Sequence, residues 1–389
     1  MASSLAARML ARPSFEKAFS PQSFVRAMLA FESALARAQA DEGLIPQRDA
    51  ETIASACATI VIDLEGLVAE GRRHASLAVP LVRLLREETA RRRGGAEKHV
   101  HLGATSQDVL DTATVLCLKP CLEEADRALE SAIRVLALRA IEHRATPMLG
   151  RTLMQPAMPI TAGLKLARWA AALAQDRERL AEAQADALAV QLGGPVGALE
   201  SLGAKAPAVR HHLATHLGLA DVPSWHAHRN AWIDLLDRMA QVTVTAGKIA
   251  RDVSIASQPE IGEMLEAAPS DSAGGSSSMP HKRNPAACAL ALAAAHRMPG
   301  LVASLHASAI AENERGLGGW QAELAIVPEM ASVLGTSVDF VEAIGPSLVI
   351  DAPRMAENLE RFGEGRGSDA ASLQAAMDEL LARLATYLS

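Results

Sequence analysis

Residues 274–285 combine side chains that suit a carboxylate substrate. They read Gly-Gly-Ser-Ser-Ser-Met-Pro-His-Lys-Arg-Asn-Pro, with three hydroxyls, cations and a carboxamide in one short stretch. The two glycines predict a loop with an unusual backbone. Asn284 followed by Pro285 predicts a helix start, with Asn284 as N-cap and Pro285 at the first helical position. A generic Ser/Gly stretch is more often a linker, but this one should bring hydroxyls, Lys282 and a positive helix end together.

Four further segments carry more polar chemistry than packing requires. Residues 101–108 read His-Leu-Gly-Ala-Thr-Ser-Gln-Asp, in which Thr105 and Asp108 have the spacing of a helix capping box. Residues 225–230 read Trp-His-Ala-His-Arg-Asn, and no third ligand supports a metal at the His-x-His pair. We therefore expect no metal. The other two segments are 150–158, Gly-Arg-Thr-Leu-Met-Gln-Pro-Ala-Met, and 312–323, which contains Glu-Asn-Glu-Arg and Trp-Gln-Ala-Glu.

Helices should position these segments. Apolar residues recur at three- and four-residue spacing over 24–38, and Gly43 and Pro46 end that helix. Much longer helical segments follow, and together they predict an elongated all-α bundle; they are 105–145, 159–192, 229–258, 285–312 and 320–342. No alternation is sufficient for a sheet. The predicted domains are an N-terminal helical domain, a central long-helix bundle and a short C-terminal helical region; they span 1–100, 101–342 and 343–389.

The composition is that of an ordinary soluble globular protein. Of the 389 residues, 49% are hydrophobic and 21% are charged. The net charge of −7, with no basic run beyond 91–93, argues against a nucleic-acid partner. No uninterrupted apolar run has the length needed to span a membrane, so we expect no membrane partner. The four cysteines show no metal-ligand pattern and favour a reduced cytoplasmic protein; they are Cys57, Cys117, Cys121 and Cys288. Cys117 and Cys121 should share one buried helix face.

The wording of 275–285 resembles the signature loop of the fumarase/aspartase superfamily. That resemblance implies a reaction without cofactor, in which Ser276 removes a proton from carbon. The choice between Ser276 and Ser277 as the base stays open. Lys282 and Asn284 would hold the adjacent carboxylate and stabilise the aci-carboxylate that forms. His101 would bind substrate or tune Ser276.

Within this superfamily, three stretches resemble the 3-carboxy-cis,cis-muconate cycloisomerase branch: Gly-Ala-Thr-Ser-Gln-Asp, Trp-His-x-x-Arg and Trp-Gln-Ala-Glu. The implied reaction interconverts 3-carboxy-cis,cis-muconate and 4-carboxymuconolactone in protocatechuate breakdown, on the β-ketoadipate route. The partner would be a small tricarboxylate, and its binding residues would be Thr105, Ser106, Arg151, Gln155, Arg229, Met279 and Arg315. The family also implies a homotetramer, in which 101–108, 150–158 and 275–285 from different subunits form each active site.

One departure from the family pattern is informative. Superfamily lyases carry histidine at the position of Leu153, of Pro156, or of both. Amine and hydroxide leaving groups need a positioned acid, whereas a carboxylate, whose conjugate acid has a pKa of about 4, does not. Opening a lactone expels a carboxylate, so the departure favours a cycloisomerase. One alternative is an adenylosuccinate lyase-type C–N lyase, which should require that histidine and a phosphate site. The other is a non-catalytic crystallin-like protein.

Overall fold

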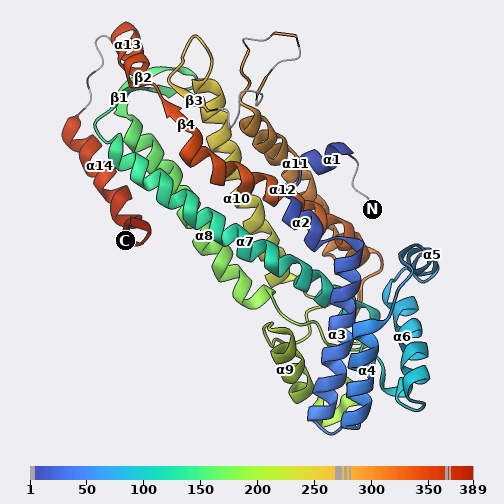
Figure 1. Ribbon diagram of the computed structural model, residues 1–389. Coiled ribbons are helices and arrows are strands. Elements are labelled where there is room, and N and C mark those ends of the chain that lie inside the picture. The colour runs from blue at the N-terminus through green and yellow to red at the C-terminus, as the bar shows by residue number, and fades with distance from the viewer. Residues whose placement is uncertain are drawn as a thin grey trace.

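A computed structural model describes residues 5–267, 274–275, 278–279, 282–363, 367 and 369–388. The fold is all-α, as predicted, and its long helices run side by side in an elongated bundle (Figure 1). Each predicted long segment is confirmed as one helix, with ends shifted by a few residues. These helices are α7 (Ser106–Glu142), α8 (Ala162–Ala187), α10 (Asn230–Ala256), α11 (Ala286–Ser308) and α12 (Gly319–Ser347).

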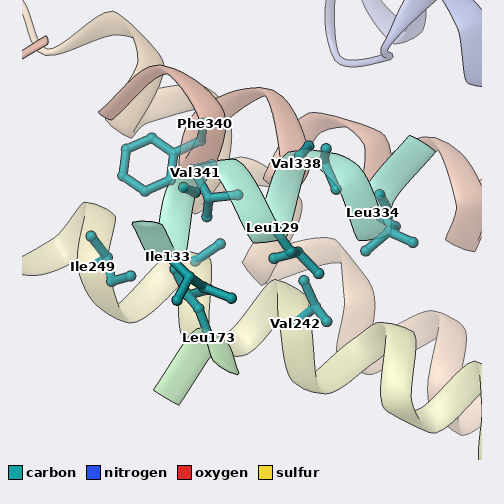
Figure 2. Close-up of a cluster of buried hydrophobic side chains, with 14 of the residues drawn as sticks. Leu129, Ile133, Leu173, Val242, Ile249, Leu334, Val338, Phe340 and Val341 are labelled. Atoms are coloured by element: carbon teal, nitrogen blue, oxygen red, sulfur yellow. The ribbon is translucent and has the colours of Figure 1, made fainter. Parts of the chain in front are cut away.

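The core of the bundle lies between α7, α8, α10 and α12. Aliphatic side chains from all four helices meet there, and Phe340 of α12 is one of the few aromatic residues among them (Figure 2). Burial of this apolar surface is the main force that holds the bundle together. Representative buried residues are Leu129, Ile133, Leu173, Val242, Ile249, Leu334, Val338 and Val341. Cys117 and Cys121 are both buried on α7, as their spacing predicted.

Helices of the N-terminal region form a second core beside one end of the bundle (Figure 1). They are α3 (Pro21–Asp41), α4 (Gln47–Thr59), α5 (Leu64–His74) and α6 (Ala78–Arg92). The two helices before them, α1 (Leu5–Met9) and α2 (Pro13–Ala18), contribute no described residue to this second core, and Phe15 of α2 is buried in the core of the bundle. Short 3-10 turns occur at Glu97–His99 and Glu200–Lys205. Helix α9 (Ala206–Leu217) contributes Val209 and Leu213 to this second core. The N-terminal core therefore includes residues beyond the predicted domain limit at 100, and the limit itself stays a prediction.

Two short antiparallel strand pairs accompany the helices, and only the first is a hairpin. β1 (Pro147–Thr152) pairs with β2 (Gln155–Thr161), and β3 (Met264–Glu266) pairs with β4 (Leu348–Ile350). The prediction of no sheet missed both pairs. Prolines at 147, 156 and 159 argue against a strand in the first pair, and β3 and β4 are only three residues long each. The turn between β1 and β2 holds Leu153 and Met154 at φ values of 50° and 65°. Positive φ at both central residues matches the twist of a tight hairpin.

The C-terminal helices pack on the central bundle. Helix α12 continues to Ser347, past the predicted limit at 342, and is followed by α13 (Ala352–Phe362), α14 (Ala370–Arg383) and α15 (Ala385–Leu388). Met355, Met377 and Leu384 are buried in the same core as α7 and α8. In the part of 343–389 that the structure describes, these residues extend the central core and form none of their own.

Helices α11 and α12 correct one expectation. In the described parts of the chain, these two are long and apolar enough to cross a membrane, judged by length and composition alone. In the most apolar 18-residue segment of each helix, 61% of α12 but only 22% of α11 is buried within the chain. The interrupted sequence of α11, with His296, Arg297 and Pro299, hid this property. Helix α11 therefore leaves an apolar side uncovered by its own chain.

Candidate functional site

Asp108 organises the first polar segment at the start of α7. The predicted capping box is present: the Thr105 backbone N–H donates to the Asp108 carboxylate at 2.9 Å. Asp108 also accepts from the backbone N–H groups of Gly193 and Gly194, at 2.9 and 3.0 Å, and from the Gln191 side chain at 2.9 Å. Burial raises the pKa of Asp108, and these four donors oppose that shift. Thr105 and the half-buried Ser106 are thereby held against the 191–194 segment.

Arg315 is attached to this cluster through Gln107. Its Nη1 donates to Gln107 Oε1 at 2.7 Å, and its Nη2 donates to the Gly194 carbonyl at 2.7 Å. The Gln107 amide nitrogen donates to Asp111 at 3.2 Å and to the His226 carbonyl at 3.0 Å, which fixes its oxygen toward Arg315. The acceptors that Arg315 meets among the described residues are neutral. Its charge therefore remains available to an anion, in agreement with the proposal that it binds substrate.

Arg229 lies deeper, at the start of α10, in a buried ion cluster. It donates to Asp111 at 2.6 and 3.2 Å and also to Glu323, and its guanidinium stacks on Trp225 at 4.5 Å from the ring centre. Glu323 accepts a further bond from Trp232 at 3.1 Å. Burial raises the pKa of Glu323, and Arg229 offsets part of that rise. Two carboxylates thus compensate Arg229 within the chain, which favours a structural role over the predicted contact with substrate. Glu323 thus orients the guanidinium of Arg229.

His226 is a satisfied core histidine. Its Nε2 lies 2.7 Å from the Glu314 carbonyl and its Nδ1 lies 2.6 Å from Ser224 Oγ, so Nε2 carries the proton and Nδ1 accepts. Burial, followed by the charge of Arg315, lowers the pKa of His226. Both ring nitrogens of His226 are used in this way, while His228 is exposed.

His101 lies just before the capped start of α7. Its Nδ1 is 2.6 Å from Glu32 Oε1 of α3, and the Glu32 side chain is fully buried. Its own backbone has φ of 63°, in the left-handed region that non-glycine residues seldom adopt. His101, Thr105, Ser106 and Arg315 therefore lie at one end of α7, on segments joined by the hydrogen bonds of Gln107 and Asp108.

Arg151 and Gln155 lie at the opposite end of the bundle, on the β1–β2 hairpin (Figure 1). Both Arg151 Nη atoms donate to Glu263, at 2.7 and 2.8 Å. Asn358 of α13 donates to the same carboxylate at 2.9 Å. This bidentate pair anchors the hairpin, while its tip extends outward: Leu153 is 96% and Met154 68% exposed, and Gln155 is exposed beside them.

Of the signature loop, Ser276 and its alternative Ser277 lie outside the described residues. Met279, Lys282 and Asn284 are exposed, and the Asn284 backbone N–H donates to the Gly274 carbonyl at 2.7 Å. The predicted cap is wrong by one residue, since α11 begins at Ala286 with Pro285 as N-cap.

A side chain of the protein itself caps the N-terminal end of α11, where we had predicted a substrate carboxylate to bind. Glu266 accepts from the backbone N–H groups of Ala287 and Cys288, at 3.0 and 3.1 Å. A carboxylate of the chain itself thus takes the positive helix end that we had expected to bind substrate. In the described part of the loop, the Lys282 and Asn284 side chains remain exposed.

The candidate residues fall into two groups at opposite ends of α7. One group holds His101, Thr105, Ser106 and Arg315, and the other holds the hairpin that follows the helix. With 37 residues at 1.5 Å each, α7 separates the groups by about 55 Å. One chain therefore cannot bring 101–108 and 150–158 into a single site.

Comparison with known proteins defines the class. A model of the lyase family matches residues 8–300, and the chain belongs to that family. The chain is 40% identical over 360 residues to 3-carboxy-cis,cis-muconate cycloisomerase of Bradyrhizobium diazoefficiens, covering 92% of this chain and 79% of that protein. It is also 37% identical over 362 residues to nitrosuccinate lyase of Streptomyces davaonensis, covering 90% and 75%.

Solved structures agree with this assignment. The crystal structure of 3-carboxy-cis,cis-muconate lactonizing enzyme from Pseudomonas putida superimposes with a TM-score of 0.87 at 33% identity, covering all of this chain and 89% of that one. The resemblance drawn from the signature loop is therefore confirmed at the level of the superfamily and its fold.

Several organising residues escaped the sequence analysis. Glu32, Asp111, Glu263 and Glu266 each hold a candidate residue or loop end, yet none belongs to a recognisable motif. For Glu32 a signal existed, because it is an acid on the apolar face of α3, between Phe31 and Leu35. An acidic residue at a core position needs a partner.

Proposed function

We propose that this chain is a cycloisomerase that interconverts 3-carboxy-cis,cis-muconate and 4-carboxymuconolactone. The observation that carries the proposal is the hairpin tip, where Leu153 and Met154 stand exposed in place of an acid, in a chain 40% identical to a cycloisomerase. A tip without an acid suits a leaving group that needs no proton. Nothing but the protein's own side chains takes part in the chemistry.

In the lactone-opening direction, Ser276 takes the proton from the carbon next to a carboxylate. The electron pair moves into that carboxylate, which Lys282 and Asn284 stabilise as the aci form. The pair then forms the carbon–carbon double bond while the ring C–O bond breaks, and the ring oxygen leaves as a carboxylate. In the closing direction that carboxylate adds to the double bond and Ser276 returns the proton. Thr105, Ser106, Gln155, Met279 and Arg315 bind the substrate around this centre.

The working form is a homotetramer with active sites shared between subunits. The separation of about 55 Å along α7 supports this, because a site that contains both ends of the helix needs more than one chain. The apolar side of α11 and the hairpin tip offer surface for such contacts. Light scattering after size-exclusion chromatography should give four times the chain mass of 40.9 kDa. The unpaired state of all four cysteines fits a cytoplasmic location.

A second reaction fits the same observation. Nitrite, like a carboxylate, is a weakly basic anion that can leave without a proton, and a nitrosuccinate lyase is among the relatives. An adenylosuccinate lyase-type reaction is less favoured, because its amine leaving group needs the missing acid. A purely structural role is disfavoured by the intact set of Ser276, Lys282 and Asn284.

The deciding experiment follows the ultraviolet absorbance of 3-carboxy-cis,cis-muconate with purified protein, beside a Ser276→Ala variant. Loss of the diene absorbance with wild type alone would support both the reaction and the base. Equal loss with the variant would transfer the base role to Ser277, tested with Ser277→Ala. No loss with either protein would refute the cycloisomerase, and nitrosuccinate would be the next substrate.

A further inference from the structure

Glu32 is a buried acid that the proposed reaction does not use. It lies on α3 among Met28, Phe31 and Leu35, and 1% of its surface is exposed. One carboxylate oxygen is 2.6 Å from His101 Nδ1, and the other is buried with no hydrogen-bond partner among the described residues.

Such a residue is unfavourable for folding. A buried carboxylate that satisfies one oxygen loses solvation without full compensation. An apolar side chain of similar size would stabilise a site of this kind at least as well. The position of the acid therefore suggests a use other than stability.

The partner of Glu32 is also held in an unfavourable state. His101 has φ of 63°, a conformation that persists in a non-glycine residue only where its surroundings enforce it. The ring retains 14% of its side-chain surface exposed, four residues before the N-cap of α7. The strained turn thus directs one ring nitrogen at Glu32 while the ring stays at the edge of the candidate site.

We propose that Glu32 is a positioning residue for the reaction proposed above, on which this inference rests. It fixes His101 with Nδ1–H toward itself and keeps the ring cationic, so that Nε2–H is a charged donor for a substrate carboxylate at the 101–106 segment. This geometry is the carboxylate–imidazole arrangement that sets both the tautomer and the charge of a histidine.

The charges around the ring agree with this role. Burial lowers the pKa of His101, but the charge and hydrogen bond of Glu32, with Asp108 of α7, outweigh burial and leave that pKa raised. Arg86 of α6 acts in the opposite direction. Behind Glu32, Cys57 of α4 has its own pKa raised first by burial and then by the Glu32 charge. Glu32 is therefore the main group that keeps His101 protonated.

The test is the pH dependence of kcat/KM for wild type, Glu32→Gln and His101→Gln. If a cationic His101 binds substrate, kcat/KM of the wild type falls as the pH rises through the His101 pKa. Glu32→Gln should move that fall at least one pH unit lower, which is about a tenfold loss at a pH well above the wild-type midpoint. His101→Gln should abolish the fall and raise KM more than it lowers kcat.

Gln39→Leu is the matched control. Gln39 is a second buried polar residue of α3, and its side chain donates to the Leu102 carbonyl at 2.6 Å. This variant disturbs the same turn without removing the partner of the ring, so the midpoint of its pH profile should equal that of wild type.

The outcomes separate the two proposals. An active wild type whose pH profile is unchanged in Glu32→Gln refutes this inference and leaves the reaction intact. If Glu32→Gln fails to fold, His101→Gln decides: an alkaline fall at the wild-type midpoint in that variant overturns the inference. A wild type that converts no 3-carboxy-cis,cis-muconate refutes the proposed function, and this inference with it.

Discussion

Replacement of Arg229 by Met tests whether the buried ion cluster is structural. The change leaves Asp111 and Glu323 in place, each about 4% exposed, with no guanidinium between them. Removal of one partner of a buried ion pair typically costs about 3–5 kcal/mol, because the remaining charge is uncompensated. Here two carboxylates lose the same partner, and Trp225 loses its stacked cation. We therefore expect a loss of at least about 3 kcal/mol in the free energy of unfolding.

The pH dependence of this loss has a defined sign. Burial raises the pKa of Glu323, and Arg229 counteracts it. Without Arg229 the pKa of folded Glu323 moves further above its value in the unfolded chain. The unfolded chain then binds fewer protons than the folded one between the two values, so stability falls as the pH rises. Arg229→Met should therefore be more destabilised at pH 8 than at pH 5.

The measurement is urea unfolding followed by far-ultraviolet circular dichroism at one protein concentration, since assembly makes stability depend on concentration. Arg383→Met is the control, because Arg383 and its partner Glu379 are both 68% exposed. Such a pair contributes about 0–1 kcal/mol. Glu323→Gln should also be less destabilising in the Arg229→Met background than in wild type, since an amide needs no counter-ion.

Two results would refute this reasoning. One is an Arg229→Met protein whose free energy of unfolding is within about 1 kcal/mol of the wild type, because two buried carboxylates that lose their shared cation should be destabilised by more than this. The other is unchanged stability with a KM raised by tenfold or more. That second result would restore the role that the sequence resemblance implied, in which Arg229 contacts a carboxylate of the substrate.

Four further predictions follow from described contacts. Asp108→Asn should lower the free energy of unfolding, measured in urea, by about 1.5–3 kcal/mol. The Asp108 carboxylate accepts from three backbone N–H groups, whereas the amide nitrogen of asparagine cannot accept from them. Glu266→Ala should lower the free energy of unfolding by about 0.5–2 kcal/mol, because the side chain that caps the start of α11 is removed. Glu266→Gln should recover part of this loss, because the amide oxygen can still accept a hydrogen bond. Leu153→His should change the free energy of unfolding by less than about 0.5 kcal/mol, since Leu153 is 96% exposed. A larger change in the assembled protein would place the hairpin tip in a contact between subunits. Burial raises the pKa of Cys117, Cys121 and Cys288 to about 12, so these thiols should resist iodoacetamide at pH 8 until the protein is unfolded.

Local signals in the sequence predicted the helices well. The long helices α7, α8 and α10 follow from apolar periodicity, and each begins and ends within a few residues of its predicted limits. The capping box of Thr105 and Asp108 was equally visible, because both partners lie within one turn of helix. Features that depend on residues close together in the sequence can be predicted without knowledge of the rest of the fold.

Long-range pairs could not be predicted in the same way. No motif in the sequence singled out Arg12, yet it contacts Glu124, Asp339 and Glu342 at 2.5–2.9 Å and joins α7 to α12. Its partners lie more than 100 residues away, and no spacing rule connects them. The same holds for Glu266, whose place at the end of α11 depends on where β3 lies. A family motif in the sequence indicates what a segment does, but it does not show which of its charged side chains form ion pairs in the folded chain.

This distinction changes how the candidate cations should be ranked. From the sequence, Arg151, Arg229 and Arg315 were predicted to bind the substrate, and Lys282 to stabilise the aci-carboxylate. The fold pairs Arg229 with two carboxylates and Arg151 with Glu263, so that neither can meet a substrate without giving up a buried partner. Arg315 meets neutral acceptors, and Lys282 is exposed on the signature loop. Arg315 and His101 lie at one end of α7, whereas Lys282 lies on the signature loop, next to the end of α11 that Glu266 of β3 caps. We therefore expect the positive charge needed for three carboxylates to be assembled where subunits meet, and activity to fall with dissociation even when each chain stays folded.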